Sequence, residues 1–267
     1  MKAVKYLLIC GVAVLITALG IDAADTLQGS SGTMLAQLLG SNEQAGCPTG
    51  MLEIPTAGTF TCVDQYEASP APDCPESDTS ELGSSQSNVA DASCKAVAHA
   101  GVLPWRNLTR EEAVLVCARS GKRLPTAAEW YQFALGSPDI ASVCNIDSGS
   151  LRKAGTAADC RSTYDVYDVV GNVWEWVSDD VFDGTYQGRS LPPEGYVVQV
   201  DSGGIATAVG TEDDQYGADY FWSKPEGAYA MMRGGYYGSR DDAGVFAVHA
   251  ATDPNFIGDA IGFRCVQ

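Results

Sequence analysis

The nine cysteines are the residues of this 267-residue chain with the widest chemistry, because a thiolate can bind a metal, attack a substrate or pair in a disulfide. No two of them form a CxxC pair, and the two histidines, His99 and His249, are isolated, so the spacing does not favour a zinc site. No serine, histidine and acid can be assigned together as a catalytic triad. The cysteines are therefore expected to form disulfides.

The N-terminus has the layout of a secretory signal. Lys2 and Lys5 precede an apolar run over 6–19, and small residues follow up to Ala24. We interpret residues 1–23 as a signal peptide; an uncleaved N-terminal anchor, and with it a membrane tether, is the alternative. Cleavage removes Cys10 and leaves an even number of cysteines in an exported chain, which favours disulfides. The cysteines that remain are Cys47, Cys62, Cys74, Cys94, Cys117, Cys144, Cys160 and Cys265.

Composition then bounds the organisation and the partners. Residues 24–45 are small and polar without a clear period, which predicts a flexible linker before one folded domain over 46–267. The 16 basic and 34 acidic residues give a net charge of -18, and the resulting field repels phosphate backbones and anionic membrane surfaces. Nucleic acid is therefore excluded as an expected partner.

Two helices are marked by capping boxes. Thr109 with Glu112 predicts the start of one helix, and Thr126 with Glu129 predicts the start of the next, each followed by apolar residues at helical spacing. Gly121 offers a left-handed end to the first helix. These two helices are expected to support the fold.

The remaining segments predict short strands and long loops. Residues 73–93 are crowded with Asp, Ser, Glu and Pro, which predicts a surface loop, and residues 178–230 are expected to form either a binding loop or a variable insertion. Strands are expected in segments rich in aromatic and β-branched residues: 173–177, 196–200, 233–237 and 262–266.

Four segments in this order resemble one superfamily: Gly121–Thr126 continuing to Trp130, Gly171–Trp176, Arg233–Gly235 and Gly262–Cys265. Together they are similar to the formylglycine-generating enzyme, or sulfatase-modifying factor, family. The resemblance implies an α+β, C-type-lectin-like fold with two helices, short strands, long loops and disulfides. It also implies a disulfide between Cys117 and Cys265. For the other six cysteines we predict nearest-neighbour pairs, 47 with 62, 74 with 94 and 144 with 160, among fifteen pairings that stay open.

The enzymes of that family use a pair of cysteines, between the Arg-Gly-Gly and Gly-Phe-Arg-Cys segments, to bind copper and activate oxygen. In this chain the interval contains no cysteine, and the corresponding places fall near Tyr236 and Asp241. Neither side chain supplies a thiolate to a soft metal. The sequence therefore predicts a protein that is not an enzyme and that needs no cofactor.

Residues 233–265 closely resemble the variable region of proteins diversified by diversity-generating retroelements. Such proteins keep an apolar framework and vary the residues between, which display side chains for binding. The resemblance implies a ligand-binding set of thirteen positions: Tyr236, Tyr237, Ser239, Arg240, Asp242, His249, Ala251, Thr252, Asp253, Phe256, Ile257, Asp259 and Ala260. Relatives often hold calcium near the Gly-Asn-x-Trp-Glu-Trp segment, where Asn172 and Glu175 offer oxygen donors.

These features predict a secreted or cell-surface protein that binds a protein or another cell-surface ligand through its C-terminal surface. Two alternatives stay open. One is an oxidoreductase of the sulfatase-modifying type that acts on cysteine, and the other is a structural envelope protein whose terminal segment only packs.

Overall fold

The computed structural model describes residues 46–55 and 58–267. The expected signal peptide or anchor at 1–23 and the expected linker at 24–45 lie outside the described residues. Among the described residues no helix is long and apolar enough to cross a membrane.

Both predicted capping boxes are present. Helix α4 (Arg110–Arg119) begins after Thr109, whose hydroxyl accepts from the Glu112 amide at 3.2 Å while the Glu112 carboxylate accepts from the Thr109 amide at 2.8 Å. Helix α5 (Ala127–Ala134) begins after Thr126 in the same way, with Glu129 as the partner. Each box satisfies two amides that a helix start leaves unpaired, so the two helices are fixed by their own sequence.

Helix α3 (Leu82–Ala90) lies within the segment expected to be a loop, so that expectation is wrong for these residues. The helix has no side-chain cap, no acidic residue in its first turn, and Ser85 and Asn88 as its buried residues. Contacts hold it instead: the Ser85 hydroxyl donates to the Arg106 carbonyl and accepts from the Trp105 indole. Tertiary partners therefore form this helix without the usual sequence signals.

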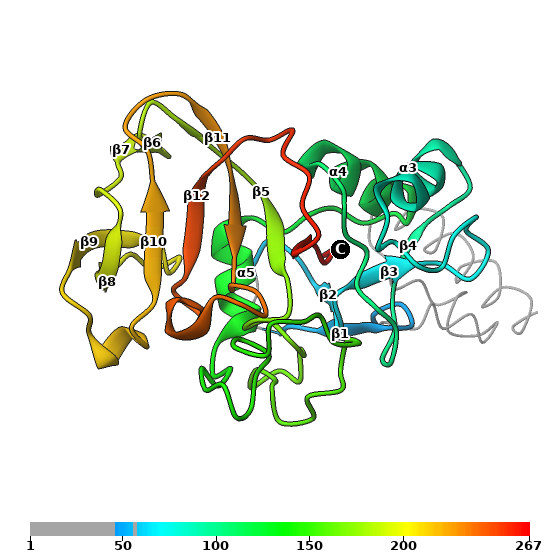
Figure 1. The fold of residues 1–267 in the computed structure, drawn as a ribbon, viewed down its shortest axis with the longest axis horizontal. Coiled ribbons are helices and arrows are strands. Elements are labelled where there is room, and N and C mark those ends of the chain that lie inside the picture. Colours follow the sequence, from blue (N-terminus) through cyan, green and yellow to red (C-terminus); the bar gives the residue numbers. More distant parts are fainter. Residues whose placement is uncertain (1–45, 56–57) are drawn as a thin grey trace, which may run out of the picture. The chain divides into compact units, whose positions relative to one another are not determined.

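One large sheet dominates the fold, in the order β7-β6-β5-β11-β12-β10-β8-β9 with β13 beside β5 (Figure 1). Two small antiparallel pairs, β1 with β2 and β3 with β4, lie outside it. The large sheet contains β5 (Trp174–Phe182), β6 (Thr185–Tyr186), β7 (Arg189–Ser190), β8 (Gly195–Val200), β9 (Ala206–Gly210), β10 (Tyr220–Ser223), β11 (Ala228–Arg233), β12 (Val248–Thr252) and β13 (Ile261–Gly262). The small pairs are β1 (Met51–Glu53), β2 (Cys62–Asp64), β3 (Ala68–Pro70) and β4 (Ala96–Ala98).

The structure confirms some of the predicted strands and not others. The strands expected at 173–177 and 196–200 are present as β5 and β8, and β5 is longer than expected. The strand expected at 233–237 is wrong beyond Arg233, because Gly234 and Gly235 have φ of 92° and 87° and turn the chain out of the sheet. Of the segment 262–266, only the first residue lies in β13, and Val266 forms isolated bridges with Val63 and Arg123.

The segment 178–230 is not a long loop, so the binding-loop alternative is wrong, while the variable insertion stays a prediction. It continues β5 and then adds β6 to β10, which form both ends of the large sheet. Its strand β10 pairs in parallel with β12 and antiparallel with β8. The C-terminal segment is therefore flanked by strands that come from this segment.

Two apolar clusters hold the sheet from its two faces. One gathers Trp130 and Phe133 of α5 with Phe221 and Val248 of the sheet. The other gathers Val116 of α4 with residues that include the Trp174 and Trp176 side chains, which share one face of β5. The sheet is thus sandwiched where α4 and α5 cover it.

All eight cysteines of the described residues form disulfides. The pairs are Cys47–Cys62, Cys74–Cys94, Cys117–Cys265 and Cys144–Cys160. This confirms both the pairing implied by resemblance and the three nearest-neighbour pairs. The Cys117–Cys265 bond closes the longest loop and ties α4 to the end of the chain.

Candidate ligand-binding surface

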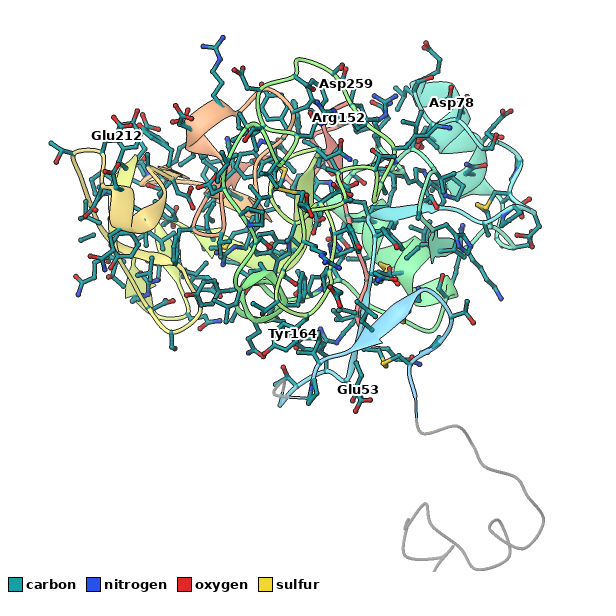
Figure 2. The ribbon with its side chains drawn as sticks, turned by 90° about the horizontal axis from the view of Figure 1, so that it is seen from below. Glu53, Asp78, Arg152, Tyr164, Glu212 and Asp259 are labelled. Atoms are coloured by element: carbon teal, nitrogen blue, oxygen red, sulfur yellow. A yellow bond between two sulfur atoms is a disulfide. The ribbon has the colours of Figure 1, made fainter. Side chains whose placement is uncertain are left out.

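A hollow of about 770 Å³ opens where the turn after β11 meets β12 and the loop that follows β12. These segments come together because β11 and β12 are antiparallel neighbours in the sheet. Nine of the thirteen predicted ligand-binding residues line the hollow: Tyr236, Tyr237, His249, Ala251, Thr252, Asp253, Phe256, Asp259 and Ala260. Among them, Asp259 lies at the molecular surface (Figure 2).

The remaining four predicted residues do not line the hollow. Ser239, Arg240 and Asp242 lie at the short 3-10 helix η2 (Arg240–Asp242), and Ile257 is half-buried in the loop after β12. Arg240 is exposed and forms an ion pair with Asp147 at 3.2 Å. The structure therefore brings most of the predicted set together and places three members on a flank formed by η2.

Exposure separates the predicted residues further. Phe256 is 51% exposed, and Asp253 and Asp259 are exposed as well. Ser239 and Thr252 are buried, at 9% and 6% exposed. The Ser239 hydroxyl accepts from the Tyr236 amide at 3.0 Å, and the Thr252 hydroxyl lies 2.6 Å from His249 Nδ1.

The floor and rim of the hollow include residues that the sequence did not mark as functional. Trp174 of β5, Met232 of β11 and Ile261 of β13 lie among the lining residues, and so does Lys224, just after β10. The alternation of strand faces, with Trp176 buried, puts Trp174 on the same face of the sheet. It could not show that this part of the face is left open, because that depends on how far the α4 layer extends over the sheet.

His249 is held neutral at ordinary pH. Burial lowers its pKa to about 4, and the positive charge of Lys224 adds to the effect. Its ring meets Trp174 edge-on at 6.0 Å. Tyr236 and Tyr237 meet in a similar T-shaped contact at 5.1 Å. The hollow therefore offers aromatic surface and a few polar groups, a composition suited to recognition.

The Arg233-Gly234-Gly235 segment anchors the turn that begins the surface. The buried Arg233 guanidinium donates to the carbonyls of Ala127 and Val245 at 2.9 and 2.7 Å. Burial lowers its pKa to about 10. A Cβ at Gly234 would lie 2.3 Å from the Val169 carbonyl oxygen, so only glycine fits there without a shift. The backbone under the hollow is thus fixed by residues outside the predicted variable set.

Asn172 and Glu175, the residues expected near a calcium ion, are engaged with protein partners. Glu175 accepts from Arg264 at 2.5–2.8 Å and from the Trp130 indole at 2.7 Å. Asn172 Oδ1 accepts from Asn145 and from the Arg152 amide, and its Nδ2 donates to Glu67. Among the described residues no group of three or more His, Cys, Asp or Glu is placed to hold a metal. A calcium ion at Asn172 and Glu175 stays a prediction.

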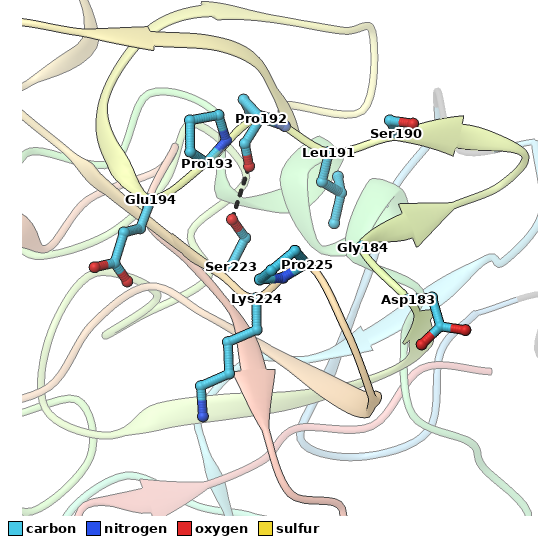
Figure 3. Close-up of a pocket in the computed structure, with 10 residues that line it drawn as sticks. All are labelled: Asp183, Gly184, Ser190, Leu191, Pro192, Pro193, Glu194, Ser223, Lys224 and Pro225. Atoms are coloured by element: carbon cyan, nitrogen blue, oxygen red, sulfur yellow. Dashed lines mark hydrogen bonds between the residues drawn. The ribbon is translucent and has the colours of Figure 1, made fainter.

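A second hollow, of about 640 Å³, lies between the segments 183–194 and 223–225, at the end of β10 (Figure 3). Three prolines, Leu191 and polar or charged residues line it, and Lys224 lines both hollows. The Ser223 hydroxyl donates to the Pro192 carbonyl at 2.7 Å across it. It contains none of the thirteen predicted residues. It therefore provides a matched control surface on the same chain.

A comparison with known proteins finds a family match that includes the sequence motifs on either side of this surface. Residues 142–267 match the sulfatase-modifying factor enzyme 1-like domain. This confirms the resemblance to the sulfatase-modifying factor superfamily over those residues, and with it the α+β, C-type-lectin-like class expected through that resemblance. Every residue that lines the hollow lies within the matched residues 142–267.

The similar proteins carry two kinds of name. The formylglycine-generating enzyme of Thermomonospora curvata is 35% identical over 100 residues, which cover 28% of this chain and 33% of the enzyme. Among solved structures, the Major Tropism Determinant U1 variant has a TM-score of 0.44 at 18% identity and covers 82% of this chain and 52% of its own. Treponema denticola variable protein 1 has a TM-score of 0.45 at 14% identity, covering 83% and 92%.

The extent of these matches limits what they say. The sequence match spans about a third of the enzyme's length, so the activity of the whole enzyme does not carry over with the sulfatase-modifying factor domain. The two solved structures are too distantly similar to this chain for either of them to indicate what it binds.

Proposed function

We propose that this chain is an exported, non-catalytic protein that binds a protein or another cell-surface ligand through an exchangeable C-terminal surface. The observation that supports it most is the convergence of nine predicted variable residues on one hollow of about 770 Å³. Residues scattered over a solvated loop would not converge in this way. Rigid aromatic side chains there can bury area at low entropic cost, while aspartates set polarity.

The disulfides support export. Four disulfides form among the described residues, and such bonds persist in oxidising compartments. Fractionation of the native host, with detection of the chain by antibody, tests this part. Recovery of the chain in the reducing cytoplasm would overturn it.

The first experiment examines the gene. Diversification by a retroelement requires a reverse transcriptase nearby and a near-copy of the codons for residues 236–260. Sequencing the locus is expected to find both. A locus without a near-copy would remove the diversified part of the proposal and leave a fixed binding surface.

The second experiment needs no known ligand. Displayed full-length chains are varied at six residues of the hollow and selected on a panel of purified proteins. A control library varies six residues of the second hollow (Figure 3). The varied positions are Tyr236, Tyr237, Ala251, Asp253, Phe256 and Asp259, and in the control Asp183, Ser190, Leu191, Pro192, Pro193 and Pro225.

Binders are expected from the first library and not from the control, because a concave aromatic surface can desolvate a partner's side chains. Changing positions 237 and 256 of a selected binder to serine should weaken its binding at least tenfold. Equal yields from the two libraries would contradict the proposal.

The name of the relatives favours one alternative, oxidation of a substrate cysteine. Against it, all eight cysteines of the described residues are in disulfides, and none lies between Arg233 and Arg264. The assay is oxygen consumption by the chain with copper and a cysteine-containing peptide. We expect none above a copper-only control, and turnover would establish the enzyme instead.

A further inference from the structure

A row of aromatic side chains runs from the hollow across three neighbouring strands. Trp222 of β10 stacks on the His249 ring at 5.5 Å and 19°. Trp222 then contacts Tyr220 at 4.8 Å, and Tyr220 contacts Tyr196 of β8 at 5.2 Å. We call Trp222, Tyr220 and Tyr196 the aromatic row. All three are partly exposed.

The strand register explains why the row forms. Trp222 pairs with His249, and Tyr220 pairs with Tyr196, so the four side chains lie on one face of the sheet. On the opposite face Phe221 and Val248 are buried in the cluster that contains α5. Helix α4 packs on β5, which β11 and β12 separate from β10, and within the described part of the chain no helix lies over β8 and β10 on this face (Figure 1).

The surroundings of the row are acidic. Asp242, then burial and Glu212, raise the pKa of Tyr196, while burial, then Glu194 and Asp242, raise the pKa of Tyr220. None of these three carboxylates takes part in an ion pair among the described residues. Glu212 lies toward the end of the domain that carries β9 (Figure 2).

One cation lies at the hollow end of the row. Lys224 lines the hollow, is exposed, and acts on His249. The opposite end, at Tyr196 and Tyr220, faces carboxylates with no basic partner. The row therefore has an uncompensated negative field over aromatic faces, and the chain as a whole has a net charge of -18.

We propose that the aromatic row is a fixed extension of the binding surface that receives an arginine or lysine side chain of a protein ligand. An aromatic face attracts a cation within about 6 Å of its centre. The carboxylates of Glu194 and Glu212, which also lie outside the thirteen exchangeable positions, add complementary charge, and Asp242 adds to it in this sequence. The inference rests on the proposed function. It adds a division of roles within the surface. The aromatic row comes from β8 and β10, outside the thirteen exchangeable positions, so it selects ligands that carry an exposed basic side chain. The exchangeable residues of the hollow then select one ligand within that class.

The experiment titrates the full-length oxidised chain with Gly-Arg-Gly-Arg-Gly-Arg-Gly and with the same peptide carrying citrulline, which is neutral and nearly the same shape. Tryptophan indole resonances report the site by NMR, with Trp222 assigned from the Trp222→Leu variant. We expect the arginine peptide to shift the Trp222 resonance and to bind at least fivefold more tightly than the citrulline peptide.

The variants test each part of the row. Tyr220→Ala and Trp222→Leu should each weaken arginine-peptide binding at least threefold. Lys224→Gln should strengthen it about twofold, because it removes the nearby positive charge. Phe182→Ala serves as the control, since Phe182 is equally aromatic and 60% exposed but lies at the far end of β5. It should change nothing.

Equal affinity for the two peptides would overturn the inference, and so would an unchanged affinity in both row variants. Binding of a neutral oligosaccharide such as cellohexaose at Trp222, without binding of the arginine peptide, would also overturn it. These failures differ from failure of the proposed function. If the hollow library yields binders while the peptides fail, only the aromatic row is refuted; if the peptides bind while the library fails, the exchangeable hollow is refuted.

Discussion

At the scale of single residues, the buried ion pair between Arg264 and Glu175 combines a high electrostatic cost with a strong constraint on the fold. Arg264 is fully buried and also donates to the carbonyls of Asp64 and Tyr167. It thereby joins the last segment of the chain to β5 and to the N-terminal part of the domain. Taking two charges out of water is costly, so such a pair persists only with all its hydrogen bonds made.

Glu175→Gln should therefore destabilise the domain strongly. The substitution leaves a buried guanidinium without its counter-charge, which costs about 3–5 kcal/mol in comparable cases. Urea unfolding monitored by circular dichroism measures the loss. The control is Asp165→Asn, which breaks an exposed pair with Arg161 and should cost less than about 1 kcal/mol. Equal losses in the two variants would contradict this account.

His249 gives the surface a pH dependence with a definite sign. Its pKa falls from 6.5 to about 4 on folding, chiefly through burial. Between those values the unfolded chain binds a proton that the folded chain does not, so the free energy of unfolding decreases as the pH falls from 6.5 to 4. The contribution is on the order of 3 kcal/mol.

The comparison of the native chain with His249→Phe isolates this contribution. Asp139 and Asp168, whose pKa values burial raises to about 6, titrate in the same window with the opposite sign, but they are common to both proteins. Urea unfolding at pH 7 and pH 4 should show the native chain losing more stability than the variant. An equal loss would mean that His249 is accessible to protons in the folded state.

At the scale of elements, local chemistry decided how much could be predicted. The capping boxes at Thr109 and Thr126 act within one turn, so both helices could be predicted from sequence alone. Helix α3 could not, because its buried Ser85 and Asn88 give no apolar pattern and its partners lie far along the chain. Likewise, glycine pairs signal a turn only when their φ is known, and Gly234 was placed in a strand that in fact ends at Arg233.

The Cys117–Cys265 disulfide should be the most stabilising of the four bonds. In the chain-entropy account a closed loop of 15 residues contributes about 3 kcal/mol and one of more than 100 residues about 5 kcal/mol. The separations here are 148 residues for this bond and 15 for Cys47–Cys62. The double variant C117A/C265A should therefore lose more than C47A/C62A, as measured by denaturant unfolding. The opposite order would show that the long loop already has structure in the unfolded chain.

At the scale of the whole molecule, the domain separates support from display. Disulfides, the Arg264–Glu175 pair and the Arg233 anchor all lie outside the thirteen exchangeable positions. The sequence could predict which residues these positions are, through their order within a recognised framework. It could not predict that Lys224, from the segment 178–230, lines the hollow, because that adjacency depends on the parallel pairing of β10 with β12.

If this separation holds, the residues of the hollow that are not buried should tolerate replacement together. A variant with Tyr237, Ala251, Asp253, Phe256 and Asp259 all changed to serine should have a free energy of unfolding within about 2.5 kcal/mol of the native chain, since surface changes usually cost less than about 0.5 kcal/mol each. Single changes of Ser239 or Thr252 to tyrosine should cost about 1–3 kcal/mol, because both side chains are buried and hydrogen-bonded. Thermal unfolding of the three proteins ranks them. If the variant with five serines were less stable than both single variants, the hollow would be part of the core, and the separation of support from display would be wrong.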